Sequence, residues 1–164
     1  MTVALALIAT VAVERLVEIA YAARNARALF ARGAVEIGRG HYPLVVALHA
    51  SWLATLVLAL PPEPAIAVIP LILFVLLQLL RMWVIATLGP YWTTRIVTLA
   101  GAPLMRHGPY RFLRHPNYVI VAGEIAVLPL VFGETWVAVV FSILNAVMLS
   151  WRIRVEDRAL AERG

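Results

Sequence analysis

The chain has 164 residues, of which 63% are hydrophobic and 14% are charged, and its mean hydropathy is +0.89. In a water-soluble domain of this length about a quarter of the residues are charged, so the composition predicts an integral membrane protein. The length predicts a single domain, residues 1–164. The net charge is +5, but the arginines flank apolar segments without forming a basic stripe, which argues against nucleic acid and favours contact with anionic membrane lipids.

Five hydrophobic segments follow one another along the chain. They run from about 3 to 23, 42 to 60, 65 to 88, 118 to 132 and 135 to 151. A helix of about 20 residues crosses a hydrocarbon core of about 30 Å, so the first three segments are long enough to span a membrane. The fourth spans it only if it starts earlier, tilts little or meets a thinned bilayer. We therefore predict an all-α integral membrane fold with five transmembrane helices and a further C-terminal helix.

The connections between these segments alternate in charge. The turns around Glu63 and Glu134 contain no arginine, whereas the other two connections and the C-terminal tail are rich in it. Under the positive-inside rule the arginine-rich regions are cytoplasmic and the N-terminus is outside, which agrees with five crossings. The arginines concerned are Arg24, Arg27, Arg32 and Arg39, then Arg95, Arg106, Arg111 and Arg114, and finally Arg152, Arg154, Arg158 and Arg163.

The connection between the third and fourth segments begins with the run Tyr91–Thr98, which is rich in aromatic and β-branched residues. Such a run predicts a small hairpin or an extended segment that covers the cytoplasmic end of the helices. We interpret Tyr91 and Trp92 as anchors at the membrane interface, where aromatic residues are common. Arg95, flanked by apolar and hydroxyl residues, is instead a candidate for the functional site.

Two polar blocks carry the most specific pattern. His107-Gly108-Pro109-Tyr110 is followed closely by Arg114-His115-Pro116-Asn117-Tyr118, and the tail contains Arg152-Ile153-Arg154-Val155-Glu156-Asp157-Arg158-Ala159-Leu160. Together these blocks resemble the isoprenylcysteine carboxyl methyltransferase family of small membrane enzymes, although Asp157 stands where a second glutamate is common. The resemblance covers about residues 88 to 160.

The resemblance implies a methyltransferase that depends on S-adenosyl-L-methionine and binds it between the polar loop and the C-terminal helix, on the cytoplasmic side. The hydrogen-bond donors and aromatic rings of the polar loop suit the amino acid head, ribose and adenine of this cofactor. No metal is expected, since the histidines show no ligand spacing with acidic residues and the chain has no cysteine. The residues expected to bind the cofactor are His107, Gly108, Pro109, Tyr110, His115, Pro116, Tyr118, Glu156 and Asp157.

Charged residues also lie inside the apolar segments. The first segment carries Glu14, Arg15 and Glu18, followed by Asn25, and a charge at mid-helix costs about 2.5–3.5 kcal/mol, so these side chains should face protein or a cavity. We expect them to bind the substrate, the alternative being an internal Arg15–Glu18 ion pair. Glu124 either pairs with Arg81 or an arginine of the first segment, or faces the substrate. The expected catalytic residues are Glu124, Arg95 and Arg152.

A wider set of residues narrows the resemblance. This set resembles a bacterial subgroup of the family that is similar to alkylpyrone O-methyltransferases, and it consists of Asn25, Arg32-Gly33-Ala34-Val35-Glu36, His41-Tyr42-Pro43, the run Trp92–Ile96, His115-Pro116-Asn117-Tyr118 and Glu124. This implies a lipophilic acceptor, an alkylpyrone, alkylresorcinol or similar enol or phenol, in a bacterial plasma membrane. The alternatives are carboxyl methylation of an isoprenylcysteine-like substrate, a membrane reductase that uses NADPH, and a transporter subunit or sensor without catalysis.

Overall fold

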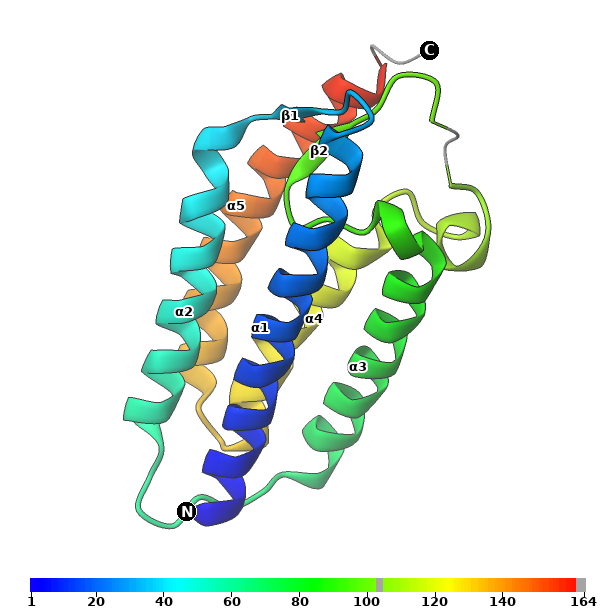
Figure 1. Ribbon diagram of the computed structural model, residues 1–164. Helices are drawn as coiled ribbons and strands as arrows, with labels where there is room; N and C mark the ends of the chain where they lie inside the picture. Colours follow the sequence, from blue (N-terminus) through cyan, green and yellow to red (C-terminus); the bar gives the residue numbers. More distant parts are fainter. Residues whose placement is uncertain (103–104, 162–164) are drawn as a thin grey trace.

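The computed structural model describes residues 1–102 and 105–161. In this part of the chain five α-helices run up and down in one bundle, as Figure 1 shows. They are α1 (Thr2–Phe30), α2 (Tyr42–Ala59), α3 (Val68–Leu88), α4 (Pro116–Val131) and α5 (Thr135–Ala161). The predicted helical fold is therefore confirmed.

Glycine and proline set most of the helix ends. The helix α1 continues past the predicted end at residue 23 because no glycine or proline interrupts the chain until Gly33, whose φ is +89°. The helix α4 begins at Pro116, a residue suited to the first helical turn, and Gly133 follows its end with φ +80°. No glycine or proline occurs in α5, so the expected C-terminal helix is the continuation of the fifth segment.

Three helices are long and apolar enough to cross a membrane, over the ranges Arg39–Ala59, Val68–Tyr91 and Thr135–Ala159. The helix α4 is apolar but shorter, and α1 carries charged residues in its middle. Large apolar side chains such as Leu58, Ile69 and Val147 lie exposed on the outside of the bundle, as lipid-facing residues do. The protein is thus an integral membrane protein, and a count of five spans remains a prediction.

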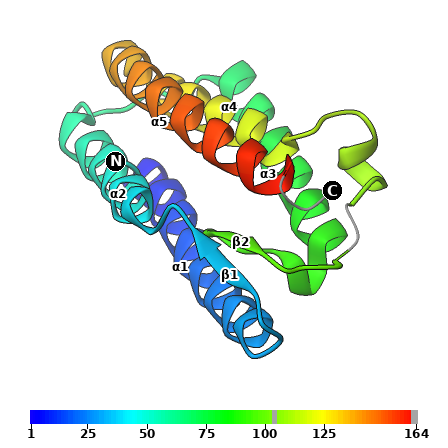
Figure 2. The same ribbon diagram turned by 90° about the horizontal axis from the view of Figure 1, so that it is seen from above.

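The helices are arranged so that α4 packs between α3 and α5, while α2 packs on α5 and α1 lies beside α2 (Figure 2). An apolar core fills the half of the bundle near the N-terminus, with Val11, Trp52, Phe74, Ile125 and Phe141 all buried in it. A second, smaller apolar cluster lies at the other end, around Trp92. The functional residues discussed below surround this smaller cluster.

Two short strands join the arginine-rich connections. The strand β1 (Val35–Ile37) pairs antiparallel with β2 (Ile96–Thr98), with Glu36 opposite Val97. The run Tyr91–Thr98 is therefore partly extended, which is one of our two alternatives, the other being a small hairpin. The strand that pairs with it, β1, comes from the connection between α1 and α2. The sequence signal for β1 is weak because the strand has only three residues, fewer than most strands. The chain turns directly after it at Gly38, where φ is +64°.

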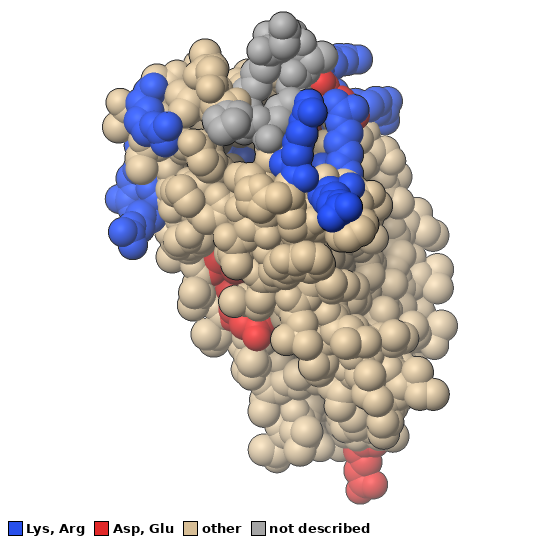
Figure 3. Space-filling model, turned by 90° about the vertical axis from the view of Figure 1, so that its right-hand side faces the viewer, with Lys and Arg blue, Asp and Glu red and all other residues tan. Residues whose placement is uncertain are grey.

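Charge is distributed unevenly along the bundle. Figure 3 shows the arginines gathered at the end that carries the strands, above a body with few charges. The alternation of helix directions places the turns around Glu63 and Glu134 at the opposite end. The three arginine-rich regions of the sequence thus share one end of the molecule.

Candidate active site

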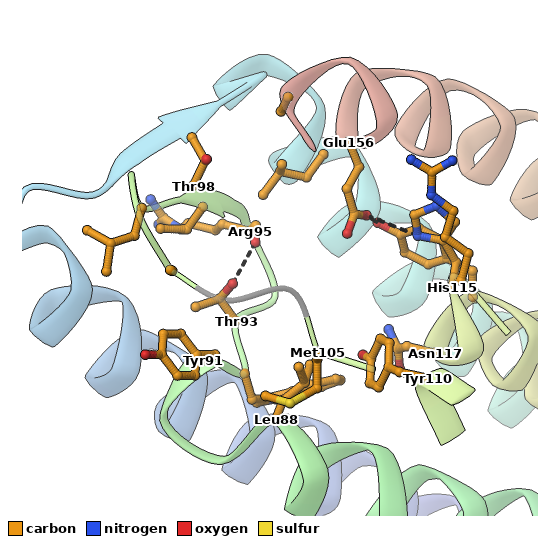
Figure 4. Close-up of a pocket in the computed structure, with 18 of the residues that line it drawn as sticks. Leu88, Tyr91, Thr93, Arg95, Thr98, Met105, Tyr110, His115, Asn117 and Glu156 are labelled. Carbon is orange, nitrogen blue, oxygen red and sulfur yellow. Dashed lines mark hydrogen bonds and ion pairs between the residues drawn. The ribbon is translucent and has the colours of Figure 1, made fainter. Parts of the chain in front are cut away.

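A cavity of about 530 Å³ opens at the arginine-rich end, between the end of α1, the connection that follows α3, the start of α4 and the end of α5. Its volume lies within the range of about 300–1,000 Å³ that is typical of small-molecule sites. Figure 4 shows its walls: Glu156, His115 and Asn117 on one side, and Tyr91, Thr93 and Arg95 across from them.

One wall is a network of hydrogen bonds between α4 and α5. The Tyr118 hydroxyl donates to the carboxylate of Glu156, and Arg152 Nε donates to the Tyr118 oxygen over 2.8 Å. Arg152 Nη2 also donates to the backbone oxygen of Thr94 over 2.5 Å, which ties the loop to both helices. Arg152 and Glu156 lie on the same face of α5, as their spacing predicts, and the Tyr118 hydroxyl bridges them.

His115 extends this network. Its ring stacks on that of Tyr118 with 5.4 Å between centroids, and its Nε2 lies 3.0 Å from Asp157 Oδ1. Arg114 Nη2 lies 3.3 Å from the same carboxylate oxygen. Asp157 does not line the cavity, so its contact with the His115 ring fixes the position of that ring without facing the cavity. We call Tyr118, His115, Arg152, Glu156 and Asp157 the motif cluster.

Other residues of the predicted cofactor site support the wall without lining it. His107, Gly108, Pro109 and Pro116 do not line the cavity. Gly108 has φ +57°, and a Cβ there would lie 2.7 Å from the Thr87 hydroxyl oxygen. Gly108, which we expected to bind the cofactor, therefore approaches α3 closely instead, and it packs the polar loop onto that helix.

Arg95 lines the cavity but is already engaged. Its guanidinium carbon lies 4.8 Å from the centroid of the Tyr42 ring, and its Nη1 lies 3.1 Å from Glu36 Oε2. Its side chain is 44% exposed, so it retains access to solvent and to the cavity. Tyr110 also lines the cavity, and burial, together with the negative charge of Glu156, raises the pKa of its hydroxyl above the usual value. Tyr110 is thus a hydrogen-bond donor at neutral pH.

The location of Trp92 in the structure disagrees with our interpretation of this residue as an anchor at the membrane interface. Only 3% of its surface is exposed, and it packs against Ala22, Val84 and Ile120 while lining the cavity. The interpretation of Trp92 as an anchor is therefore wrong, because side chains of α1, α3 and α4 pack around the indole and place it inside the bundle. The remaining apolar lining comes from side chains such as Leu29, Leu88, Ile96, Leu99 and Met105.

Two polar atoms of the cavity lining are buried without a hydrogen-bond partner among the described residues. They are the indole Nε1 of Trp92 and the amide Oδ1 of Asn117. Buried polar groups are paired in the great majority of cases, so each of these atoms is a candidate contact for a bound molecule. Neither residue was among the expected site residues. The only sequence signal for Asn117 is its position inside the His-Pro-Asn-Tyr block.

The charged residues of α1 meet α3 and α4 in the middle of the bundle. Arg81 Nε lies 2.6 Å from Glu18 Oε1, and Arg81 Nη1 lies 3.1 Å from Glu124 Oε2. Arg15 contributes an Nη1 contact of 2.9 Å to Glu18 and an Nη2 contact of 3.0 Å to Glu124 Oε1. The last contact has the distance of an ion pair without the alignment of a hydrogen bond.

Gln78 joins Glu14 to these groups. Its Nε2 donates to Glu14 Oε2 over 2.5 Å, and its Oε1 accepts from Arg15 Nη2 over 3.4 Å. We call the set Glu14, Arg15, Glu18, Gln78, Arg81 and Glu124 the ion cluster. All six residues are described, and none lines the cavity. The structure therefore contains the pairing that we considered for Glu124, with Arg81 and with an arginine of the first segment.

Asn25, expected to bind substrate, lies outside the cavity lining as well. Its Nδ2 donates to the backbone oxygen of Gly89 over 3.1 Å and to that of Trp92 over 3.0 Å. Asn25 thus fixes the loop that forms one side of the cavity. Among the described residues no group of histidine and acidic side chains is suited to hold a metal ion.

Comparison with known proteins finds a matching family model and similar bacterial proteins. The sequence model of the isoprenylcysteine carboxyl methyltransferase family matches residues 68–162, which include both polar blocks. The chain is 39% identical over 162 residues to the uncharacterized protein YpbQ of Bacillus subtilis, covering 95% of each chain. It is 24% identical over 143 residues to an uncharacterized protein of Haemophilus influenzae, covering 84% of this chain and 83% of the relative. No solved structure matches.

Proposed function

This chain belongs to the isoprenylcysteine carboxyl methyltransferase family, and we propose that it transfers a methyl group from S-adenosyl-L-methionine to a hydroxyl group of a lipophilic acceptor. The observation that carries this proposal is the cavity with two unlike walls. Four members of the motif cluster, all except Asp157, form a polar wall on α4 and α5, and the facing side is largely apolar, apart from Thr93, Arg95 and Thr98. A polar cofactor and an acceptor with a hydrocarbon tail need these two environments in one site.

The polar wall suits the cofactor. S-adenosyl-L-methionine carries hydrogen-bond donors on its ammonium, ribose and adenine groups, and it supplies an activated methyl group when bound. Asn117 Oδ1, buried without a described partner, can accept from one of these donors. Glu156 lines the same wall and offers a carboxylate, while Tyr110 and Tyr118 offer flat faces. We therefore assign Asn117 and Glu156 to the cofactor, with His115 and Asp157 holding the wall in shape.

The apolar wall suits the acceptor, which we propose to be an alkylpyrone, alkylresorcinol or similar enol or phenol. Leu88, Met105 and Leu99 give its hydrocarbon tail a surface to lie on. Glu156 is the only carboxylate among the described residues of the lining, and it already accepts a hydrogen bond from Tyr118. An acidic hydroxyl that ionises readily needs little help from a base, and the guanidinium groups of Arg95 and Arg152 stabilise a negative charge nearby.

The test is methyl transfer by the purified protein in nanodiscs, with S-adenosyl-L-methionine labelled in its methyl group. Three acceptors are compared: an alkylpyrone, an alkylresorcinol and a farnesylated cysteine analogue. We expect labelled methyl ethers from the first two. Transfer to the cysteine analogue alone would replace this proposal with carboxyl methylation. In a parallel reaction with NADPH in place of S-adenosyl-L-methionine, NADPH oxidation without any methyl transfer in the first assay would support a reductase instead.

We further propose that the arginine-rich end faces the cytoplasm of a bacterial plasma membrane, with the N-terminus outside. The asymmetry of arginine between the two ends supports this orientation. Since the chain has no cysteine, single cysteines can be introduced at Glu63 and at Arg39 and labelled in intact cells with a membrane-impermeant maleimide. Labelling at Glu63 but not at Arg39 is expected, and the reverse pattern would contradict the orientation.

A further inference from the structure

Four consecutive residues before α4 are exposed, and two of them are large and apolar. Residues 111–114, which we call the exposed turn, connect the short helix η3 (Gly108–Arg111) to the start of α4. Phe112 is 73% exposed and Leu113 is 47% exposed, although both belong to the polar loop. Large apolar side chains exposed next to each other mark a surface that contacts a membrane or another molecule.

The height of the exposed turn along the bundle follows from its neighbours. Pro109 of η3 is buried, and the backbone of Gly108 packs closely on Thr87 of α3. Thr87 lies near the end of Val68–Tyr91, a range long and apolar enough to cross a membrane. Figure 1 shows the yellow-green segment with η3 level with that end of α3, and Figure 2 shows it at the edge of the bundle. The exposed turn therefore lies at the height of one membrane surface.

The exposed apolar surface continues from the turn onto both neighbouring helices. Trp83 lies one turn before Thr87 on the same face of α3, and it is exposed. Aromatic side chains are common at this depth of a membrane protein, at the interface between lipid and water. Val119, in the first turn of α4, is exposed as well. The turn thus adjoins helix surfaces that suit contact with lipid.

The charges of the turn indicate which lipid it contacts. Arg111 and Arg114, on either side of the apolar pair, are both exposed. Arg114 pairs with Asp157, whereas Arg111 forms no ion pair with any residue in the ranges 1–102 and 105–161. An arginine can lay its apolar stem on lipid while its guanidinium stays at the level of the headgroups, where it attracts anionic phosphates.

We propose that the exposed turn inserts Phe112 and Leu113 into the adjacent membrane leaflet and binds the headgroup of an anionic phospholipid through Arg111 and Arg114. The proposal goes beyond the methyl transfer proposed above and does not depend on it. All four residues also line the cavity, so this contact brings the bilayer surface to one rim of the cavity.

The contact with the bilayer is tested with a fluorescent dye. Since the chain has no cysteine, the variant Phe112→Cys can be labelled with nitrobenzoxadiazole, which emits weakly in water and strongly in a membrane. In nanodiscs of phosphatidylcholine and phosphatidylglycerol we expect strong emission that nitroxide-labelled lipid quenches, as for the same dye at the exposed Val147 of α5. The dye at Ala100, which is exposed in the same connection but follows β2, should emit weakly.

Weak emission from both Phe112→Cys and Leu113→Cys, equal to that from Ala100→Cys, would overturn the proposal. The turn would then lie in water, where a soluble protein could bind it instead. Comparing two positions in the turn guards against a variant that fails to fold.

The choice of lipid is tested with the dye at position 112 and the nitroxide attached to either phosphatidylglycerol or phosphatidylcholine at equal mole fraction. We expect stronger quenching by phosphatidylglycerol. Its preference over phosphatidylcholine should fall about fivefold in Arg111→Gln, the effect of one arginine at an anionic membrane surface. The matched control is Arg24→Gln, which removes an exposed arginine from α1. Equal quenching by both lipids, or equal losses in the two variants, would overturn the assignment of an anionic lipid to the turn.

Discussion

The ion cluster and the motif cluster are both sets of polar side chains on facing helices, but they differ in what lies beside them. In the ion cluster the carboxylates of Glu18 and Glu124 each meet both Arg15 and Arg81, and no member lines the cavity. In the motif cluster Tyr118, Arg152 and Glu156 are bonded to one another and also form a wall of the cavity. The charged groups of the ion cluster face one another, and the groups of the motif cluster also face the cavity.

The difference teaches that a charge inside an apolar helix is a poor guide to catalysis by itself. Such charges are costly in a bilayer, and a helix can meet that cost by pairing them with charges on its neighbours. The helix α1 does so: its acids and Arg15 reach across to α3 and α4 and attach it to them. We therefore propose that the ion cluster assembles the bundle and that the motif cluster performs the binding.

The largest effect should follow from Arg81→Ala. Arg81 is buried and contacts both Glu18 and Glu124, so its removal leaves the buried carboxylate of Glu124 and the partly buried one of Glu18 with Arg15 alone. Breaking a buried pair of this kind costs about 3–5 kcal/mol of folding free energy. Unfolding in detergent, followed by circular dichroism, measures the change. Arg154→Ala is the control, because Arg154 is exposed and, within residues 1–102 and 105–161, donates only to the backbone of Ser150. Equal stability of the two variants would contradict a structural role for the ion cluster.

The next effect should be on the cofactor. Glu156→Ala removes the carboxylate that accepts from Tyr118, and His115→Ala removes the ring stacked on Tyr118. We expect each to lower the affinity for S-adenosylhomocysteine about tenfold or more, the effect of one charge-assisted hydrogen bond, while the protein stays folded. Glu63→Gln, at the opposite end of the bundle, should bind like the wild type. Unchanged affinity in both cluster variants would remove the motif cluster from the cofactor site.

A smaller effect is expected for Asn117→Ala. The variant removes a buried oxygen that no described residue satisfies, so the stability of the protein without ligand should not fall. The affinity for S-adenosylhomocysteine should fall about fivefold, measured by calorimetry. Asn25→Ala is the contrasting variant, since Asn25 bonds the backbone of Gly89 and Trp92 and its loss should lower stability. If Asn117→Ala destabilises the protein and leaves the affinity intact, Asn117 is structural.

The smallest effect on the rate is expected for Glu124→Gln. The amide keeps the shape of the carboxyl but lowers its attraction to Arg15 and Arg81, so stability should fall. The rate of methyl transfer per folded molecule should remain nearly intact, because Glu124 does not line the cavity. A rate that drops severely and partly recovers at higher pH would instead identify Glu124 as the base that takes the proton from the acceptor.

The sequence allowed much of this to be predicted. Long apolar segments between glycine, proline and arginine predicted the helices, and the two polar blocks predicted that His115, Tyr118, Arg152 and Glu156 would meet. Periodicity could not show that Trp92 is buried, because its burial depends on residues distant in the sequence, such as Ala22 in α1 and Ile120 in α4. For the same reason Gly108 was assigned to a ligand although its neighbour is Thr87.

The central claim is that the cavity at the arginine-rich end holds S-adenosyl-L-methionine. Isothermal calorimetry on the purified protein, titrated in turn with S-adenosylhomocysteine and with NADP, tests it most directly. The account predicts saturable binding of S-adenosylhomocysteine at one site per chain and no heat of binding with NADP. Binding of NADP, with none of S-adenosylhomocysteine, would contradict it.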